Sequence, residues 1–522
     1  MTTLDTGRVI VIGAGLAGLY AALKLAPLPV LLISPEPLGS GASSAWAQGG
    51  VAAAMGTEDT PMRHAADTIR AGAGIVDAAV ARYVTGAAPS HVLDLTGLGT
   101  PFDRDALGNY LLSREAAHSI ARVVRVRGDQ AGREIMATLV ALVEQTPRIA
   151  RLEGAVATDL VMEGSYVTGV QVAFRRSGVL TQRRLTGRAV LLAGGGSAGL
   201  YALTTNPPRV RGQVIGMAAR AGAWIADAEF VQFHPTAIDI GLDPAPLATE
   251  ALRGEGAILV NRRRERFMLG LHPDAELAPR DVVARAVYAQ TQAGLRPALD
   301  TRAALGDRLL QDFPAVAAAC AAGGVDPLRD PIPVAAAAHY HMGGVEVDLK
   351  GRSNLGGLWA CGETSSTGLH GANRLASNGL LEALVFAETC ARDIRDRIGE
   401  GAGALPPLPF RPDPQAPDPD ADAVAGLRQL MTDNVGVVRE AVGLGAALAE
   451  TIRLEAESED PQLRNMAATA ALIAAAALVR KESRGAHFRS DVPEPRPDYA
   501  QRSTLTLEAA REIRVRGRKE PA

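Results

Sequence analysis

The segment that most restricts the fold is RVIVIGAGLAGLYAALKL, residues 8–25. A β-branched apolar run passes directly into Gly13-x-Gly15-x-x-Gly18 and then into a helical pattern, which predicts the strand, tight turn and helix of a dinucleotide-binding unit. Gly13 permits the turn, Gly15 lets a pyrophosphate approach the backbone, and Gly18 lets the helix pack on the strand. These flanks favour a dinucleotide site over an ordinary glycine-rich turn.

The second strand of such a unit normally ends in an acid that binds the ribose hydroxyls. Here PVLLIS ends at Ser34, and Glu36 follows two residues later. Either Glu36 reaches back to the ribose or Ser34 makes a weaker contact, and both interpretations stay open.

Two further segments are rich in glycine. GSGASSAWAQGGVAAA (39–54) offers backbone donors without bulk, and Trp46 and Gln48 argue against a flexible linker. AVLLAGGGSAGLY (189–201) repeats the strand-into-glycine pattern. Two such elements in one chain are more typical of FAD proteins than of an NAD domain.

Length and charge limit the class of protein. The 522 residues predict two to four domains, and a net charge of −3 gives no reason to expect nucleic acid or a membrane surface as a partner. The cysteines Cys320, Cys361 and Cys390 suggest neither a disulfide framework nor a metal site. The apolar run 466–479 is too short to span a bilayer and predicts a buried helix. With no basic, signal-like N-terminus, we expect a cytoplasmic protein.

Several longer motifs carry a family resemblance. They are WAQGGVAAA, QFHPT (232–236), TEALRGEGAILVN (249–261), RFM, APRDVVARAV, HYHMGGVEVD and LHGANRLASNGLLEALVFA, followed by SRGAHFRSDVP (483–493). In this order the chain resembles the succinate dehydrogenase and fumarate reductase flavoprotein family. The resemblance implies FAD as cofactor and hydride transfer between a dicarboxylate and flavin N5.

The resemblance also implies an architecture. We expect an α/β FAD-binding Rossmann-like domain with an inserted α+β capping domain and a C-terminal helical bundle. The expected boundaries are 1–232 and 343–398 for the FAD-binding domain, 233–342 for the capping domain, 399–422 for a Pro-rich linker and 423–522 for the helical domain. The linker composition is typical of a semi-rigid or disordered connector, and we expect disorder from about Arg511.

Two positions distinguish the branches of this family. Respiratory members carry a flavin-linked histidine five residues before the glutamine of the AQGG motif, where this chain has Ser43, so FAD should be bound non-covalently. Glu115 lies in SREAAHS (113–119), a charged run that by itself most often indicates a solvated loop. The respiratory branch tends to have an apolar residue in this loop, and SREAAHS resembles the version found in family members that oxidise L-aspartate. Because a buried glutamate would repel a plain dicarboxylate, the resemblance implies that Glu115 binds the ammonium group of L-aspartate.

The resemblance assigns the other catalytic roles. His234, His339 and Arg374 match the carboxylate ligands, with Thr249 as a supporting hydroxyl. Arg280, which alone would suggest a solvated first-turn residue, matches the proton-transfer residue, and Glu250 and Arg253 match the relay behind it. We expect His64, His91, His272 and His487 to be surface or structural residues, while the role of His341 stays open.

The flavin end is expected to use Glu363 and the helix start at SNGL, whose N-terminus would stabilise negative charge on the reduced ring. Gln213 and Val214 stand where the family usually has aspartate and glycine, which leaves the FAD contact there open. The expected FAD-binding residues are Gly13, Ala14, Gly15, Leu16, Ala17, Gly18, Ser34, Ser43, Ser44, Ala47, Gln48, Gly49, Gly50, Gln213, Glu363, Ser377, Asn378, Gly379 and Leu380.

The resemblance, together with Glu115, implies an enzyme that oxidises L-aspartate to iminoaspartate, with O2 (giving H2O2) or fumarate as electron acceptor. This reaction is the first step of de novo NAD biosynthesis and implies functional coupling to quinolinate synthase. One alternative is a soluble fumarate reductase or succinate dehydrogenase flavoprotein subunit. Another is a flavin-binding assembly subunit that docks to an iron–sulfur partner and has no turnover of its own.

Overall fold

A five-stranded parallel sheet forms the centre of the nucleotide-binding domain in the computed structural model, which describes residues 2–399 and 405–517. Its order is β18 (Leu358–Ala360), β11 (Ala189–Leu192), β2 (Val9–Ile12), β3 (Val30–Ser34) and β7 (Ile149–Glu153). All residues of β2, β3 and β11 are buried, because a parallel sheet is covered on both faces. The sequence therefore shows continuous apolar runs here rather than an alternating pattern.

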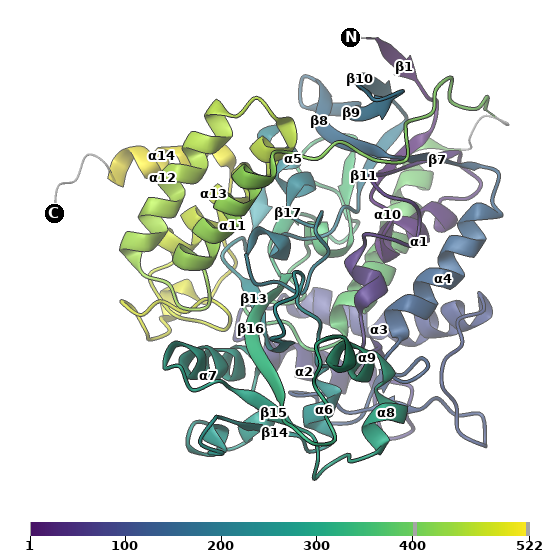
Figure 1. The fold of residues 1–522 in the computed structure, drawn as a ribbon. Coiled ribbons are helices and arrows are strands. Elements are labelled where there is room, and N and C mark those ends of the chain that lie inside the picture. The colour runs from purple at the N-terminus through teal and green to yellow at the C-terminus, as the bar shows by residue number, and fades with distance from the viewer. Residues whose placement is uncertain (1, 400–404, 518–522) are drawn as a thin grey trace.

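Helices from distant parts of the chain pack together beside this sheet. The helix α1 (Leu16–Lys24) contacts both α4 (Ala131–Glu144) and α10 (Asn378–Ile398), and the three lie next to one another (Figure 1). Both β18 and α10 follow the inserted region in the sequence, so the chain returns to complete this domain.

Smaller elements surround this centre. A second sheet has the order β1 (Thr3–Asp5), β10 (Val179–Thr186), β9 (Tyr166–Arg176) and β8 (Ala155–Glu163). A three-stranded sheet consists of β4 (Val51–Ala52), β6 (Val123–Val124) and β5 (Leu112–Ser113). The remaining helices of this domain are α2 (Pro61–Ala71), α3 (Ala78–Gly97) and α5 (Gln213–Arg220).

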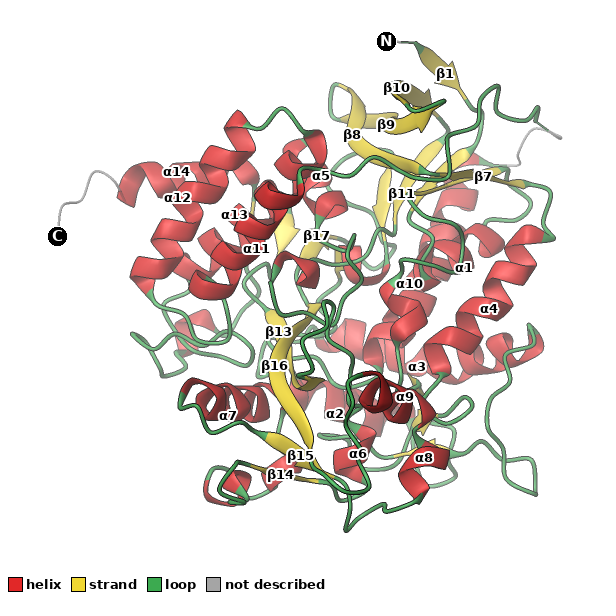
Figure 2. Cartoon of the chain, viewed as in Figure 1, coloured by secondary structure: helices red, strands yellow, loops and turns green. Residues whose placement is uncertain are grey.

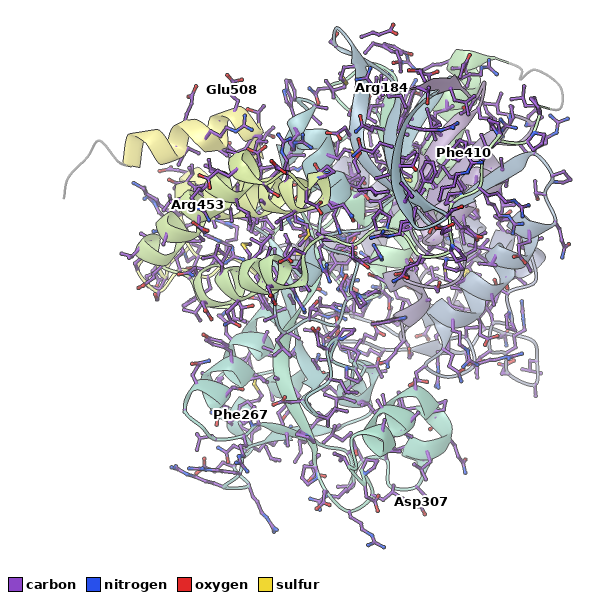
Figure 3. All side chains as sticks on the ribbon, turned by 45° about the horizontal axis from the view of Figure 1, so that its top comes forward. Arg184, Phe267, Asp307, Phe410, Arg453 and Glu508 are labelled. Atoms are coloured by element: carbon purple, nitrogen blue, oxygen red, sulfur yellow. The ribbon has the colours of Figure 1, made fainter. Side chains whose placement is uncertain are left out.

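The inserted region begins and ends on two paired strands. The chain leaves along β13 (Val231–Ile238) and returns along β16 (Ile332–His341), and the two strands pair antiparallel. Between them are α6 (Ala251–Gly254), β14 (Ile258–Val260), α7 (Arg280–Gln292), β15 (Ala298–Asp300), α8 (Arg308–Asp312) and α9 (Pro314–Ala322). These elements enclose a hydrophobic core of their own, and Phe267 and Asp307 mark this region in Figure 3.

The C-terminal part is a helical bundle, drawn above α7 of the inserted region in Figure 2, and Arg285 of α7 donates to the Gly485 carbonyl of this part at 3.0 Å. It contains α11 (Ala421–Asn434), α12 (Ala441–Glu457), α13 (Pro461–Val479) and α14 (Leu507–Gly517). Within the described residues, α13 is the one helix long and apolar enough to cross a membrane, yet 83% of its apolar window is buried inside the protein. The prediction of a buried bundle helix is confirmed.

The Pro-rich segment does not behave as a free connector. From residue 405 onward it lies along the nucleotide-binding domain, where Arg8 donates to the carbonyl of Pro406 at 2.7 Å. Phe410, labelled in Figure 3, stacks on Phe174 with ring centroids 5.0 Å apart. The Asp413 carboxylate accepts hydrogen bonds from two backbone N–H groups of the β9–β10 turn. These contacts order the segment, and residues 400–404 of the predicted linker lie outside the described residues.

The expectation of a disordered tail is also wrong for residues 511–517. They belong to α14, which packs on α12 and α13, and Arg511 pairs with Glu455 at 2.7 Å. Just before it, β20 (Thr504–Leu505) pairs with β12 (Ile225–Ala226) in a sheet completed by β17 (Gly344–Glu346) and β19 (Ser365–Ser366). Tertiary partners therefore order this segment, and residues 518–522 lie outside the described part of the chain.

Candidate active site

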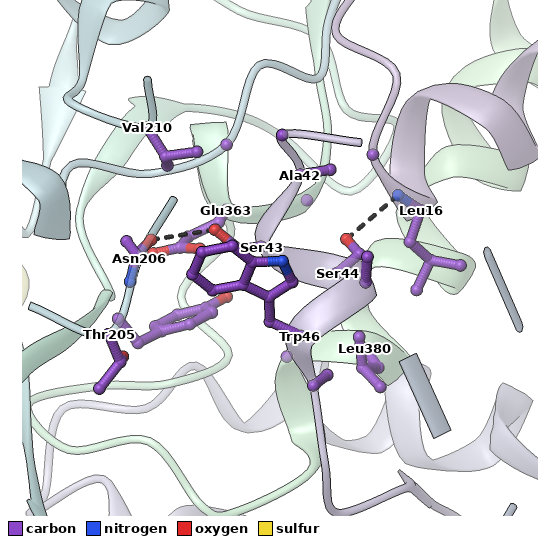
Figure 4. Close-up of a pocket in the computed structure, with 18 of the residues that line it drawn as sticks. Leu16, Ala42, Ser43, Ser44, Trp46, Thr205, Asn206, Val210, Glu363 and Leu380 are labelled. Carbon is purple, nitrogen blue, oxygen red and sulfur yellow. Dashed lines mark hydrogen bonds between the residues drawn. The ribbon is translucent and has the colours of Figure 1, made fainter. Parts of the chain in front are cut away.

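A cavity of about 760 Å³ lies between the nucleotide-binding domain and the inserted region. It is lined by the β2–α1 turn, the hydroxyl-rich segment 40–50, strands β13 and β16, the start of α10 and one side of α9. Figure 4 shows the part of it around Ser43, Trp46 and Glu363. Most of the residues selected from the sequence line this one cavity.

Three glycines shape the nucleotide end of the cavity. A Cβ on Gly13, whose φ is +108°, would lie 2.2 Å from the carbonyl oxygen of Ala193, and one on Gly18 would lie 1.9 Å from that of Gly13. Gly15 is more open, because its nearest neighbour would be Ser44 Oγ at 3.4 Å. Gly13 and Gly18 thus bring strand and helix together, while Gly15 leaves room for a pyrophosphate at the N-terminus of α1.

The hydroxyl of Ser44, which is distant in the sequence, provides the hydrogen bond that the N-cap residue of α1 does not. Gly15 is the N-cap of α1, and the backbone N–H of Leu16 donates to Ser44 Oγ at 3.1 Å (Figure 4). Ser34 and Glu36, the two candidate ribose ligands, both line the cavity. Arg209, which has no motif to mark it in the sequence, pairs with Glu36 at 3.2 Å and balances its charge.

The flavin end is built around Glu363. Its Oε1 accepts a hydrogen bond from the backbone N–H of His341 at 2.8 Å, and burial raises the pKa of Glu363 to about 7. A Cβ on Gly196 would lie 2.2 Å from this oxygen, so the second glycine cluster makes room for the carboxyl group. Ser43 Oγ is 3.0 Å from Asn206 Oδ1 (Figure 4), and a serine hydroxyl here provides no imidazole for a bond to flavin. The residues present therefore fit a non-covalently held FAD.

Irregular pairing of β13 and β16 places two histidines together. The register shifts beside Gln232 and again after His234, so His339 is the extra residue on β16 at the first shift. Such bulges re-aim side chains next to active sites. As a result the His234 and His339 rings lie edge to face, with centroids 5.0 Å apart.

His234 has one nitrogen ready for a ligand. Its Nδ1 accepts the backbone N–H of Thr236 at 3.2 Å, so the proton of the neutral ring resides on Nε2. That Nε2 is buried and has no hydrogen-bond partner among the described residues. Burial and the nearby charge of Arg280 hold the pKa of His234 well below its usual value. His234 is thus a neutral hydrogen-bond donor that lacks an acceptor, such as a substrate carboxylate.

Arg374 brings positive charge to the same cavity. Its Nε has no hydrogen-bond partner within the described part of the chain, and burial lowers the pKa of Arg374 to about 10. A buried cation in this condition favours an anionic ligand. Thr249 also lines the cavity, so the predicted carboxylate ligands converge.

Arg280, Glu250 and Arg253 form a row of alternating charges. Arg280 Nε donates to Glu250 Oε2, and its Nη1 donates to Gln232 at 3.1 Å. Arg253 Nη2 is 3.3 Å from Glu250 Oε1 on the far side. Burial would raise the pKa of Glu250, but the charges of Arg280 and Arg253 outweigh it and hold that pKa below its ordinary value.

Glu115 is buried against the cavity and is not part of a solvated loop. Only 3% of it is exposed, and its Oε2 accepts a hydrogen bond from Ser377 Oγ at 2.9 Å. Burial and the charge of Glu250 raise the pKa of Glu115 to about 7. A Cβ on Gly49 would lie 2.5 Å from Glu115 Oε1, so a larger residue there would displace the carboxyl group from this position. An ammonium group is the natural partner for such a carboxylate.

Comparison with known proteins accounts for this combination of groups. An FAD binding domain model matches residues 8–380, and a fumarate reductase flavoprotein C-terminal model matches residues 458–519. L-aspartate oxidase of Caulobacter vibrioides is 53% identical over 96% of each chain, and that of Mesorhizobium japonicum is 47% identical over 96% of this chain and 94% of its own. The chain belongs to the L-aspartate oxidase family.

Solved structures show the wider relationship of this L-aspartate oxidase family member. The E. coli quinol fumarate reductase FrdA has a TM-score of 0.85 and 27% identity, covering 97% of this chain and 94% of its own. Sdh1 of Mycobacterium smegmatis has a TM-score of 0.80 and 29% identity over the same shares. The predicted architecture of a succinate dehydrogenase and fumarate reductase flavoprotein is confirmed, and the cofactor is FAD.

Three predicted site residues of this family member do not line the cavity. Gly18 packs α1 on β2, and Arg253 lies behind Glu250. The Asn378 side chain faces α2 instead of the cavity, where its Oδ1 is 2.8 Å from His64 Nε2. Its position at the start of α10 suggested a flavin contact, but the direction of its side chain depends on packing.

Other cavity residues were missed because no motif separates them from ordinary polar residues. Thr205 Oγ1 lies 2.8 Å from His339 Nδ1, and Asn206 donates to the His339 carbonyl at 2.7 Å. Tyr340 lies inside HYHMGG, yet it was overlooked between two histidines. His341 is structural, because its Nε2 is 2.9 Å from the carbonyl of Ala228.

The remaining histidines agree with the expectation of surface or structural roles. His64, His91 and His487 are buried among protein partners, and His272 is partly exposed on the inserted region. His487, for example, lies 2.9 Å from Arg439 Nη1 in the C-terminal part. None of these four lines the cavity.

Proposed function

We propose that this chain oxidises L-aspartate to iminoaspartate with FAD, using O2 (and releasing H2O2) or fumarate as electron acceptor. The observation that carries this proposal is the buried carboxylate of Glu115 within a cavity that also contains Arg374 and Arg280. Two cations suit the two carboxylates of a dicarboxylate, and the added carboxylate suits its amino group. The relatives named L-aspartate oxidase support the same conclusion.

The chain's own groups position the substrate. His234 Nε2, His339, Thr249 and Arg374 bind the two carboxylates, and Glu115 binds the ammonium group. When bound, FAD supplies the acceptor for the hydride that leaves the substrate Cα. Holding the Cα–H in one orientation is the main contribution of the protein to the rate.

Oxidation of L-aspartate removes a proton from the substrate in addition to the hydride. We propose that Arg280 is the residue that accepts this proton. Arginine is a poor base in water because it stays protonated, but here it lies between the cavity and Glu250. Arg253 supports the charge of Glu250 from the other side. The row from Arg280 to Arg253 thus gives a proton a path away from the cavity.

The product determines what must follow. Iminoaspartate is unstable in water, so we propose functional coupling to quinolinate synthase in de novo NAD biosynthesis. We also propose that the enzyme works in the cytoplasm, where reducing conditions match three buried, free cysteines, Cys320, Cys361 and Cys390.

The deciding experiment is anaerobic mixing of the FAD-loaded protein with L-aspartate and, separately, with succinate. We expect L-aspartate to bleach the oxidised-flavin absorbance, with recovery and peroxide release on admitting air. The variant Glu115→Gln should lose this response, because the amide cannot pair with an ammonium group by charge. Bleaching by succinate alone would support the alternative of a fumarate reductase or succinate dehydrogenase flavoprotein. Absence of bleaching by both substrates would favour an assembly subunit.

A further inference from the structure

A buried network of charged groups holds His118 and Ser119, in the loop that also carries Glu115. Arg122 is fully buried and donates to both oxygens of Asp59, at 2.8 and 3.1 Å, and to Asp67 at 2.5 Å. Asp67 Oδ2 also accepts the backbone N–H and the hydroxyl of Ser119, at 2.8 and 2.7 Å. Because Asp67 belongs to α2, the loop that carries Glu115 is tied to that helix.

His118 connects this network to the other substrate loop. Arg122 Nη1 lies 3.1 Å from His118 Nδ1, and because arginine only donates, this nitrogen is the acceptor. The proton of the neutral ring is therefore on Nε2, which donates to the carbonyl oxygen of Ala376 at 3.0 Å. Ala376 lies between Arg374 and Ser377, so His118 joins the loop of the ammonium ligand to the loop of a carboxylate ligand.

Helix α2 holds the second loop as well. His64 Nε2 is 2.8 Å from Asn378 Oδ1, and Asn378 Nδ2 donates to Thr68 Oγ1 at 3.0 Å. One face of α2 thus carries Asp67 for the first loop and His64 with Thr68 for the second. Helix α2 thus contacts both loops, and His118 links the two loops directly. His118 does not itself line the cavity.

We propose that His118 is a positioning residue that sets the separation between Glu115 and Arg374, and so selects a dicarboxylate with an ammonium group. The inference rests on the proposed function, in which Glu115 binds the ammonium group of the substrate and Arg374 binds one of its carboxylates. A ligand that carries both groups must match this separation. Succinate and fumarate have no ammonium group, so their binding does not depend on it.

Two variants that differ by one methylene test the link. His118→Gln keeps an amide long enough to donate to the Ala376 carbonyl, whereas His118→Asn keeps a partner for Arg122 but falls short of Ala376. The probes are α-methyl-L-aspartate, which lacks the Cα–H and so is not oxidised, and fumarate. Dissociation constants come from calorimetry on the FAD-loaded protein, and kcat and KM for L-aspartate are measured in parallel.

We expect His118→Asn to weaken binding of α-methyl-L-aspartate and to raise the KM for L-aspartate, each by about tenfold, with fumarate binding changed by less than about twofold. His118→Gln should stay within about threefold of the original protein for both ligands. Equal weakening of both ligands by His118→Asn, or no weakening of either, would overturn the proposal. So would a His118→Gln variant that behaves like His118→Asn.

Folding is checked by thermal melting and FAD retention. If His118→Asn does not fold, Ser119→Ala replaces it, because it removes one bond to Asp67 and keeps the backbone N–H; the same selective loss is expected, at about threefold. Retained selectivity in Ser119→Ala would then overturn the inference. Failure of L-aspartate to bleach the flavin of the original protein would instead refute the proposed function.

Discussion

The guanidinium of Arg374 lies over the face of the Tyr340 ring, 4.4 Å from the ring centroid. No side-chain hydrogen bond of Arg374 to the described residues accompanies this contact, and its Nε lacks a partner. The Tyr340 hydroxyl in turn donates to Glu382 at 3.2 Å, which holds the ring in place. The ring is therefore the contact that orients Arg374, the cation proposed to bind a substrate carboxylate.

Replacing the ring tests this orientation. Tyr340→Leu should raise the KM for L-aspartate and weaken fumarate binding alike, by about 2- to 30-fold, because a cation–π contact contributes about 0.5–2 kcal/mol. Tyr340→Phe keeps the ring and should stay near the original values. Steady-state kinetics measure the KM for L-aspartate in both variants. An equal increase in KM in Tyr340→Leu and Tyr340→Phe would show that the Tyr340 hydroxyl, and not the ring, orients Arg374.

The ionisation of Glu115 predicts a pH dependence. Burial and the charge of Glu250 raise the pKa of Glu115 to about 7, so at lower pH the empty site holds a neutral carboxyl group. Binding of the ammonium requires the ionised form, so kcat/KM for L-aspartate should rise about tenfold per pH unit below pH 7 and level off above it. A Glu115→Gln variant whose residual activity kept this acidic limb would assign the limb to another group.

Arg253 is predicted to act through Glu250. Its charge and that of Arg280 hold the pKa of Glu250 down against burial, so Arg253→Met should raise this pKa and shift the acidic limb of kcat to higher pH. Removing one partner of a buried pair should also cost about 3–5 kcal/mol of unfolding free energy.

A control for this variant is Arg308→Met, which breaks an exposed pair with Glu255 in the same inserted region. That change should cost about 0–1 kcal/mol and leave the pH profile of kcat unchanged. An unshifted profile in Arg253→Met, measured alongside denaturant unfolding, would exclude Arg253 from the proton path.

Asp129 links the nucleotide-binding domain to the inserted region. Its carboxylate accepts the backbone N–H groups of Ala315 and Val316, at 3.2 and 3.3 Å, in the first turn of α9. Ala315 also lines the cavity. Asp129→Ala should weaken this cap by about 0.5–2 kcal/mol, which should speed both FAD release and proteolysis near α9.

Asp420→Ala is the matched control for Asp129→Ala. Asp420 caps α11 through the Ala423 N–H at 2.8 Å, and among the described residues no hydrogen bond joins it to a second domain. Its loss should leave FAD release unchanged. If Asp129→Ala releases FAD no faster than Asp420→Ala, measured by flavin fluorescence after dilution, the contact does not hold the two regions together.

Much of this protein follows from its sequence. The strand, turn and helix around Gly13 and Gly15 are specified locally, because backbone sterics and helix geometry act over a few residues. Most of the residues that the motifs indicated line one cavity, although that cavity also contains residues that no motif marked. The sequence also predicted Glu115 as the ligand of a substrate ammonium group. In the structure Glu115 is buried, and its carboxylate accepts a hydrogen bond from Ser377.

Tertiary packing decided what the motifs left open. Asn378 begins α10 whether its side chain faces the cavity or helix α2. The contact with His64 turns the side chain away from the cavity. The composition around Phe410 left a semi-rigid or disordered connector open and that around Arg511 suggested disorder, yet Phe174 and Glu455 order both segments. Local sequence specifies backbone shape and chemical type, whereas side-chain direction and the order of weakly structured segments depend on partners far away in the chain.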